Sequence, residues 1–233
     1  MPFFLQEDLD YFPHPYFSDP DGLLCLGPDL STDKLLLAYQ FGIFPWYHED
    51  EPVLWWFTHP RFVLYPDKLK ISKSLRSQIN KNLFRVSFDT AFEEVIRNCK
   101  NIKRTGQEDT WITEDLIQCF IDLHERGIAH SVEVWENDEL VGGLYGISLG
   151  KVFYGESMFS KSTNASKVGF VQLVKYLEER DYTLIDCQQE TQHLASFGAE
   201  LIPAEKFFNT LRSNIFADHS AKKWIFGLSD DTV

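Results

Sequence analysis

The sequence contains few cysteines, and they are scattered. Its 233 residues include four of them, Cys25, Cys99, Cys119 and Cys187, and no two form a C-x-x-C pair. The seven histidines show neither H-x-x-x-H nor H-E-x-x-H spacing. Because such spacings mark disulfide frameworks and zinc sites, the sequence predicts neither a disulfide framework nor a metal site.

Long apolar runs are also missing. No stretch approaches the roughly 18 consecutive apolar residues that a membrane-spanning helix needs, and the first residues, MPFFLQEDLDYF, lack the basic start of a signal peptide. The chain has no repeat or low-complexity tract, and 44% of its residues are hydrophobic. We therefore expect a globular, cytoplasmic protein with a substantial core and no membrane association.

The charges are distributed unevenly. The net charge is −13, yet residues 61–104 hold eleven of the 22 Lys and Arg residues against four acids, so this segment is +7 and the remainder −20. Such asymmetry favours an anionic partner at the basic segment and a cationic partner elsewhere. The alternative is an ordinary basic surface that contacts only solvent.

Two helices are indicated by their end signals. In STDKLLLAYQFG, Ser31 or Thr32 is placed to cap the N-terminus and Gly42 to end the helix. In TWITEDLIQCFIDLHERG, Thr113 is the expected cap and Gly127 the expected end.

From Ser131 the apolar period changes to two, which is typical of strands. SVEVW, ELVGGLYGISL and KVFYGESMF predict three strands joined by turns at Asn137-Asp138 and Gly150-Lys151. A helix is expected over 166–179, followed by a short strand, TLIDCQ. The order β-β-β-α-β indicates an α/β fold (α+β) with a mixed sheet.

Three polar residues on these strands are candidates for chemistry. Alternation predicts that Tyr154, Glu156 and Met158 share one face of their strand, and that Asp186 and Gln188 share one face of theirs. A buried carboxylate without partners is costly, so each acid is either hydrogen-bonded or kept for a ligand. The structural alternative is that these acids bind loop amides.

Several segments, taken together, resemble one bacterial family. They are AYQFGIFPW, PVLWWFTHPR, DTWIT, HSVEVWENDELVGGLYGISLG, FYGESMFSKSTNASK and LIDCQ followed by HLASFGA. In this order they are similar to the leucyl/phenylalanyl-tRNA–protein transferases. The resemblance implies a small N-terminal domain over 1–62 and, over 63–233, a GNAT-like acyltransferase domain. It implies transfer of Leu or Phe, and less readily Met, from aminoacyl-tRNA to the N-terminal Arg or Lys of proteins, which marks them for degradation in an N-degron pathway.

The resemblance also assigns substrate contacts. The adenosine and aminoacyl end of the tRNA is expected to meet Tyr39, Trp46 and Trp111, because aromatic rings stack on bases without reading sequence. The expected pocket for the aminoacyl side chain consists of Leu144, Phe153, Met158, Phe170, Leu173, Leu177 and Ile185. This chain departs from the family pattern at 120, 144 and 173 by apolar or aromatic exchanges, and at Phe57-Thr58-His59, to which the sequence assigns no function.

The reaction that the resemblance implies needs no cofactor, because the tRNA ester is already activated. An α-amine has a reference pKa of about 7.7 to 8.0, so a neutral fraction exists at cellular pH. We expect Gln188 to orient the amine, Asp186 to fix Gln188, and Glu156 to hold amino groups at the reaction centre.

The uneven charge fits the same function. Lys73, Arg76, Lys81 and Arg85 are expected to contact the tRNA backbone. The acidic remainder favours acceptors that begin with Arg or Lys, and we expect the protein to act as a monomer.

Two other functions stay open at this stage. An acetyl-CoA-dependent N-acetyltransferase of the same fold class usually carries a [QR]-x-x-G-x-[GA] turn, and the sequence lacks one. A non-enzymatic RNA-binding module would use the basic segment but leave Glu156, Asp186 and the apolar pocket unexplained. Transfer of labelled Phe from Phe-tRNA to a protein that begins with Arg separates these alternatives.

Overall fold

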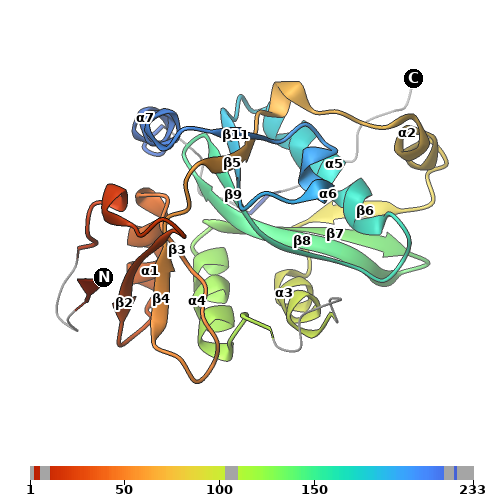
Figure 1. Ribbon diagram of the computed structural model, residues 1–233. Helices are drawn as coiled ribbons and strands as arrows, with labels where there is room; N and C mark the ends of the chain where they lie inside the picture. The colour runs from red at the N-terminus through yellow and green to blue at the C-terminus, as the bar shows by residue number, and fades with distance from the viewer. Residues whose placement is uncertain (1–2, 6–10, 103–109, 218–222, 225–233) are drawn as a thin grey trace.

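Two β-sheets organise the protein, as the computed structural model shows over residues 3–5, 11–102, 110–217 and 223–224, the part of the chain that it describes (Figure 1). The smaller sheet has the order β1 (Phe3–Phe4), β2 (Leu23–Gly27), β4 (Val53–Trp56) and β3 (Phe44–Pro45). The larger sheet has the order β11 (Glu200–Ile202), β5 (Arg61–Leu64), β10 (Leu184–Gln188), β9 (Val152–Ser160), β8 (Glu139–Leu149), β7 (Ala129–Glu136) and β6 (Arg85–Phe88).

The larger sheet is mixed, as the order of elements predicted. Strands β7, β8 and β9 form an antiparallel meander, and the turn between β7 and β8 has Asn137 and Asp138 at φ 49° and 64°, the conformation of a two-residue hairpin turn. The helix α5 (Ala165–Glu178) follows, and it leads to β10, which pairs parallel with β9 and antiparallel with β5. The predicted β-β-β-α-β order and mixed α/β class are therefore confirmed.

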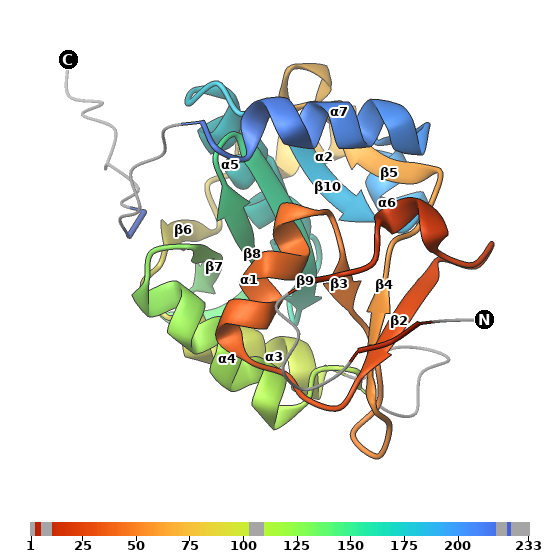
Figure 2. The same ribbon diagram turned by 90° about the vertical axis from the view of Figure 1, so that its left-hand side faces the viewer.

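The two helices with clear end signals form where the sequence predicted them. In α1 (Thr32–Gln40), the Ser31 side chain accepts a hydrogen bond from the Lys34 amide, and Gly42 follows at φ 70°. In α4 (Glu114–Glu125), Thr113 accepts from the Leu116 amide. Figure 2 shows α1 and α4 side by side, and the Thr32 hydroxyl donates to Asp122 across their contact.

Helices cover both faces of the larger sheet. On one face lie α4 and α3 (Phe92–Asn101), whose buried side chains join the core shared with the small sheet. On the other lies α5, with α2 (Lys73–Ile79) and α6 (Gln192–Ala195) near it (Figure 1). The last helix, α7 (Ala204–Asn214), packs Phe207 and Leu211 into the core beside Gly42.

The chain passes from the smaller to the larger sheet between β4 and β5. The expected boundary after residue 62 lies within β5, whose four residues are all buried. The core is continuous across this passage, because residues of α1 and β4 pack in one cluster with residues of α3, α4, β8 and β9. The two sheets therefore hold one another in place, and a site between them has fixed walls.

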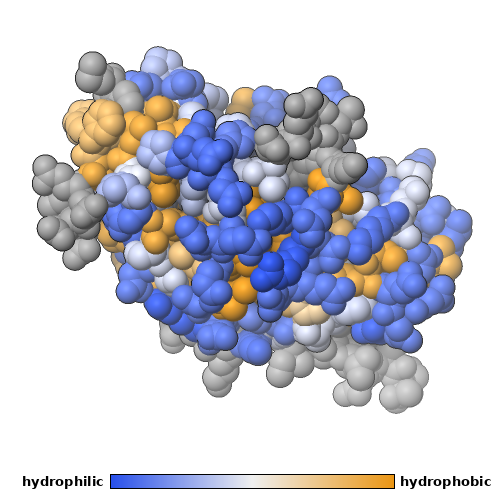
Figure 3. Space-filling model, turned by 90° about the horizontal axis from the view of Figure 1, so that it is seen from below, coloured by the Kyte–Doolittle hydropathy of each residue, from blue (hydrophilic) through white to orange (hydrophobic). Residues whose placement is uncertain are grey.

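Exposed apolar side chains are concentrated in the N-terminal segment. Phe3, Phe4, Tyr11, Tyr16 and Phe17 are all more than 40% exposed. Viewed from below in Figure 3, the molecule is largely hydrophilic, with hydrophobic residues gathered toward the side on which Figure 1 draws the N-terminal strands. None of the helices in the described ranges is long and apolar enough to cross a membrane.

Candidate active site

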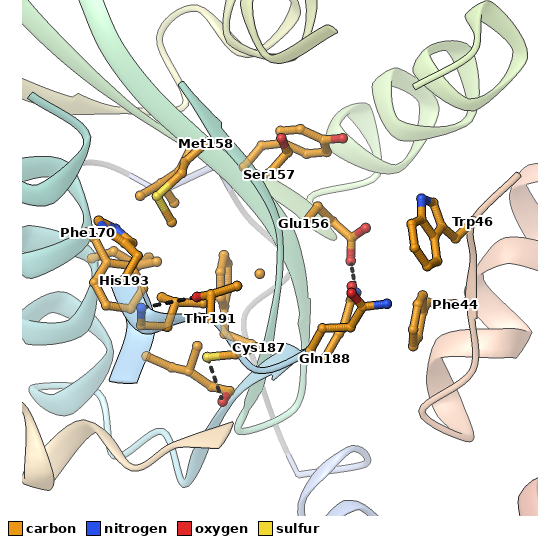
Figure 4. A pocket seen from close by; sticks show the side chains of 18 of the residues that line it. Phe44, Trp46, Glu156, Ser157, Met158, Phe170, Cys187, Gln188, Thr191 and His193 are labelled. Atoms are coloured by element: carbon orange, nitrogen blue, oxygen red, sulfur yellow. Dashed lines mark hydrogen bonds between the residues drawn. The ribbon is translucent and has the colours of Figure 1, made fainter. Parts of the chain in front are cut away.

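A pocket of about 410 Å³ opens between the loop around β3 and the strands β8, β9 and β10. Six of the seven residues expected to hold an apolar side chain line it: Leu144, Phe153, Met158, Phe170, Leu173 and Ile185. Figure 4 shows Met158 and Phe170 on one side, Phe44 and Trp46 on the other, and Glu156 and Gln188 between them. The pocket thus has an apolar part and a polar pair beside it.

A β-bulge puts Glu156 at the pocket. In the pairing of β8 with β9, Tyr145 lies opposite Ser157 and Gly146 opposite Gly155, so Glu156 is the extra residue on β9. A bulge shifts the alternation of side chains by one residue. Tyr154 therefore packs in the core on the α1 side while Met158 faces the pocket. The prediction that these two share a face was wrong for this reason.

Glu156 is only partly accessible, and its hydrogen bonds are few. The Gln188 Nε2 donates a hydrogen bond of 2.9 Å to the Glu156 Oε1, drawn as a dashed line in Figure 4. Burial raises the pKa of Glu156 to about 8, and the negative charge of Asp186 adds to the rise, while the Tyr39 hydroxyl and Gln188 oppose it. At neutral pH the carboxyl group of Glu156 is therefore mostly protonated.

Gln188 reaches the pocket through an unusual backbone conformation. It ends β10 with φ 59°, in the left-handed region that non-glycine residues seldom adopt. The pairing of β10 with β5 shifts register between Asp186 and Gln188. Because of this irregularity the two side chains do not share a face, contrary to the sequence prediction. Asp186 is fully buried, whereas Gln188 lines the pocket.

Asp186 holds the backbone of Gln188 instead of its side chain. The Asp186 Oδ1 accepts a hydrogen bond of 2.9 Å from the Gln188 amide. The same carboxylate forms a bidentate ion pair with Arg61, with 2.8 Å from Nε to Oδ1 and 2.6 Å from Nη2 to Oδ2. Both side chains are fully buried. Asp186 thus holds Gln188 in place, but through the backbone amide of Gln188.

Neither Leu177, which the resemblance expects in the aminoacyl pocket, nor Tyr39, which it expects at the tRNA end, is among the residues that line the pocket. Each is fully buried. Tyr39 lies on α1, where its ring packs edge-on against Tyr154, 5.2 Å between centroids. Leu177 lies one helical turn beyond Leu173 on α5, in the core under the sheet. Helical spacing alone does not tell where a pocket ends along the helix.

Trp46 and Trp111, which the resemblance expects to contact the nucleoside, both line the pocket. Trp46 lies 5.7 Å from Trp56 between ring centroids, and the Trp56 indole N–H donates to the backbone oxygen of Trp46. These contacts fix the position of the Trp46 ring. An aromatic surface is therefore ready on the side opposite Met158 and Phe170.

Sequence reasoning missed part of the lining. The lining residues that it missed are Phe44, Pro45, Tyr145, Gly155, Ser157, Cys187, Gln189, Thr191, His193 and Leu194. Most of these lie inside or next to the quoted segments GIFPW, GESMF and LIDCQ, so proximity to those segments was the available signal. Burial raises the pKa of the Cys187 thiol, and the charge of Asp186 raises it further, so this cysteine is not poised as a nucleophile.

The four basic residues expected at the tRNA backbone are all exposed. Lys73 and Arg76 lie on α2, and Lys81 and Arg85 follow in the loop and at the start of β6. In Figure 1 this group lies at the end of the molecule opposite the small sheet, and α2 packs near α5, which also lines the pocket. Arg85 stacks over Trp135 and pairs with Asp138 at 3.4 Å. Residues 103–104, the end of the basic segment, lie outside the described residues.

The site defines a class of protein. An apolar pocket with a small number of convergent polar groups is the arrangement of an enzyme that holds an apolar group and acts on the atoms attached to it. In the ranges that the structure describes, no group of three or more His, Cys, Asp or Glu is arranged to hold a metal ion.

Sequence comparisons identify the family. Residues 63–212 match the family model described as "Leucyl/phenylalanyl-tRNA protein transferase", and residues 28–59 match the model of its N-terminal domain. The chain belongs to the leucyl/phenylalanyl-tRNA–protein transferase family, which is a family of aminoacyltransferases, and the resemblance found from the sequence is confirmed.

Relatives cover nearly the whole chain. A protein of Flavobacterium psychrophilum named leucyl/phenylalanyl-tRNA–protein transferase is 52% identical over 209 residues, which are 90% of this chain and 99% of that protein. One of Myxococcus xanthus with the same name is 46% identical over 233 residues, 99% of this chain and 100% of its own. Among solved structures, L-PGS from Bacillus licheniformis shows only a TM-score of 0.40 and 11% identity over 82% of this chain and 64% of its own. The family assignment therefore rests on sequence.

Proposed function

We propose that this protein transfers Leu or Phe, and less readily Met, from aminoacyl-tRNA to the N-terminal Arg or Lys of acceptor proteins. The observation that carries the proposal is the pairing of an apolar pocket with the Glu156–Gln188 hydrogen bond at its side. The printed names of the relatives support Leu and Phe as donor amino acids.

The donor side of the reaction follows from the pocket lining. A Leu or Phe side chain is buried against Met158, Phe170 and Leu173, and the terminal adenosine stacks on Trp46 and Trp111. An apolar pocket separates side chains that differ by one methylene by only about 1 to 3 kcal/mol. The pocket thus accepts several apolar amino acids, and it leaves the ester carbonyl near the polar pair.

The polar pair serves the incoming amine. Since the Gln188 Nε2 donates to Glu156, the Gln188 Oε1 is the atom left to accept an N–H from the amine. The amine lone pair then points at the ester carbon, where the C–N bond forms and the bond to the ribose oxygen breaks. Alignment of this kind contributes on the order of 7 to 11 kcal/mol to lowering the barrier.

The fraction of Glu156 that is ionised at cellular pH is suited to take the proton that the amine loses. The raised pKa of Glu156, about 8, is close to the roughly 7.7 to 8.0 of an α-amine, so proton transfer between them is nearly balanced. The proton ends on the ribose oxygen of the departing tRNA. The net reaction needs no ATP, metal or cofactor, because the energy of the ester drives amide formation.

The partners and setting follow from the same chemistry. The exposed Lys73, Arg76, Lys81 and Arg85 offer contacts to tRNA phosphates, and the net charge of −13 favours acceptors that begin with Arg or Lys. A donor that is a charged tRNA implies a cytoplasmic protein. We further propose that it acts as a monomer and that the added residue marks the acceptor for degradation.

The test is transfer of labelled Phe from Phe-tRNA to a peptide that begins with Arg. The expected result is one Phe added to the N-terminus, with no addition to a peptide whose N-terminal amine is acetylated. A matched reaction with acetyl-CoA in place of Phe-tRNA tests the N-acetyltransferase alternative. Acetylation of the peptide without Phe transfer would overturn the proposal.

A further inference from the structure

The turn between β4 and β5 lies directly behind Gln188. Thr58, within the segment Phe57-Thr58-His59 to which the sequence assigned no function, is the residue of this turn that reaches β10. Its hydroxyl donates a hydrogen bond of 3.0 Å to the backbone oxygen of Gln188. Thr58 is not among the residues that line the pocket, so it acts on the reaction through the residues that it bonds, Gln188 and Arg61.

The same hydroxyl is held by the buried guanidinium of Arg61. The Arg61 Nη1 donates to the Thr58 Oγ1 at 3.3 Å, so the hydroxyl accepts from Arg61 and donates to Gln188. Hydrogen bonds in such a chain polarise one another and strengthen the next bond. Arg61 is anchored on its other side by the Gly42 oxygen at 2.8 Å and by the Phe207 ring, 4.6 Å from its centroid.

The backbone of Gln188 is therefore held on both sides of its Cα atom. Its amide donates to Asp186 at 2.9 Å, and its carbonyl accepts from Thr58 at 3.0 Å. Both partners are tied to Arg61. A left-handed backbone conformation in a glutamine costs free energy and persists only where the surroundings impose it. The two backbone bonds are what impose it here.

Arg61, which bonds both Asp186 and Thr58, also joins the two walls of the pocket. The Arg61 guanidinium lies over the Phe44 ring, 5.1 Å from its centroid, and Phe44 lines the pocket beside Trp46. On the other side, through Asp186 and Thr58, Arg61 holds the strand end that carries Gln188. Movement of this guanidinium would therefore change the distance between the Phe44 ring and the side-chain amide of Gln188.

We propose that Thr58 is a positioning residue for the transfer reaction: its hydroxyl, held by Arg61, fixes the backbone of Gln188 so that the Gln188 side chain meets both Glu156 and the incoming amine. The inference rests on the proposed transferase function. It predicts a loss of turnover when the hydroxyl is removed and little change in donor binding, because Thr58 does not touch the pocket.

The experiment compares Thr58→Val with Thr58→Ser. Valine keeps the branched shape and removes the hydroxyl, whereas serine keeps the hydroxyl and removes the methyl group, which packs against Gly22. The control for a Thr to Val exchange is Thr210→Val, since among the described residues the Thr210 hydroxyl donates only to the Lys206 oxygen of its own helix. Each variant is assayed with Phe-tRNA and an Arg-initiated peptide, and its melting is followed by circular dichroism.

We expect Thr58→Val to lower kcat by between about tenfold and a hundredfold, since misplacement of a reacting group by about 1 Å has effects of this size. KM for Phe-tRNA stays unchanged, Thr58→Ser keeps the wild-type kcat, and so does Thr210→Val. Wild-type kcat in Thr58→Val, or an equal loss in Thr58→Ser, would overturn the inference. If Thr58→Val does not fold, Thr58→Ala against Thr58→Ser makes the same comparison. A wild-type protein that transfers no Phe would instead refute the proposed function.

Discussion

The Gln188 Nε2 donates a hydrogen bond of 2.9 Å to the Glu156 Oε1, joining two neighbouring parallel strands at the edge of the pocket. Neither side chain would reach this position from a regular strand. Glu156 is the extra residue of a bulge in β9, and Gln188 has the left-handed φ of 59° at the end of β10. The polar centre of the site thus depends on two local irregularities, each supported by buried contacts.

Replacing Glu156 by Gln will change how stability depends on pH. The pKa of Glu156 is about 8 in the folded protein and about 4.3 in an unfolded chain. Between these values the folded state keeps a proton that the unfolded state loses, so wild-type unfolding free energy falls as pH rises through this window. Glu156→Gln lacks this fall. Urea unfolding at pH 5, 6.5 and 8.5 should show the variant gaining stability relative to wild type, and a constant difference would contradict the raised pKa.

Replacing Arg61 by Met will destabilise the protein strongly. The substitution leaves the Asp186 carboxylate fully buried without its cation, and loss of one partner of a buried pair costs about 3–5 kcal/mol. The double variant Arg61→Met with Asp186→Leu should recover part of this loss, because no uncompensated charge remains. Urea unfolding of both variants measures the difference. A single variant as stable as wild type would mean that the ion pair contributes nothing.

Replacing Lys73 and Arg76 together by Gln will weaken tRNA binding in a salt-dependent way. Each phosphate neutralised contributes about 0.7 to 0.9 to the slope of log K against log salt, so the slope should become shallower by about 1.5. All tRNAs should be affected alike, because phosphate contacts carry no sequence information. The measurement is a binding titration at several salt concentrations.

The control for this pair is Lys206→Gln with Arg212→Gln. Both residues are exposed on α7, which Figure 1 shows at the other end of the molecule from α2. The two double variants have the same net charge, so an equal change of slope in both would show a general charge effect and not a contact at α2.

Replacing Trp111 by Ala will weaken binding of phenylalanyl-adenosine, a probe of the tRNA end. Loss of one stacked base costs about 1 to 3 kcal/mol, which is a decrease in affinity of roughly five- to 150-fold. Trp135→Ala serves as the control, because Trp135 is also half-buried but lies outside the pocket. Equal affinities for wild type and Trp111→Ala would remove Trp111 from the nucleoside site.

The parts of the fold that depend on local sequence could be predicted. Ser31 and Thr113 cap their helices as expected, because a cap needs only the side chain and the next few amides. The site needed more than local sequence. The bulge at Glu156 and the left-handed Gln188 arise from pairing with β8 and β5, which alternation along one strand does not contain.

Arg61 shows that a count of charges along the sequence is limited in the same way. By sequence it counts among the eleven basic residues of the segment 61–104, yet it is fully buried and paired with Asp186. A charge count does not distinguish a cation that faces solvent from one that holds a site together. The exposed members of the segment, such as Lys73 and Arg76, had to be separated from Arg61 by the structure.

The central claim is that the pocket holds the aminoacyl side chain, and filling the pocket from Gly155 tests it most directly. Gly155 lines the pocket. Apart from its two chain neighbours, a Cβ built on Gly155 meets one atom within 4 Å among the described residues, the backbone oxygen of Asp186 at 3.6 Å. The series Gly155→Ala, Gly155→Val and Gly155→Leu therefore adds volume where there is space.

The measurement is the rate of Phe transfer from Phe-tRNA to an Arg-initiated peptide across this series, with melting temperature as the check on folding. We predict a stepwise fall of kcat/KM with side-chain size in proteins that remain folded. Undiminished transfer by a folded Gly155→Leu variant would contradict the account, because the donor side chain would then bind elsewhere.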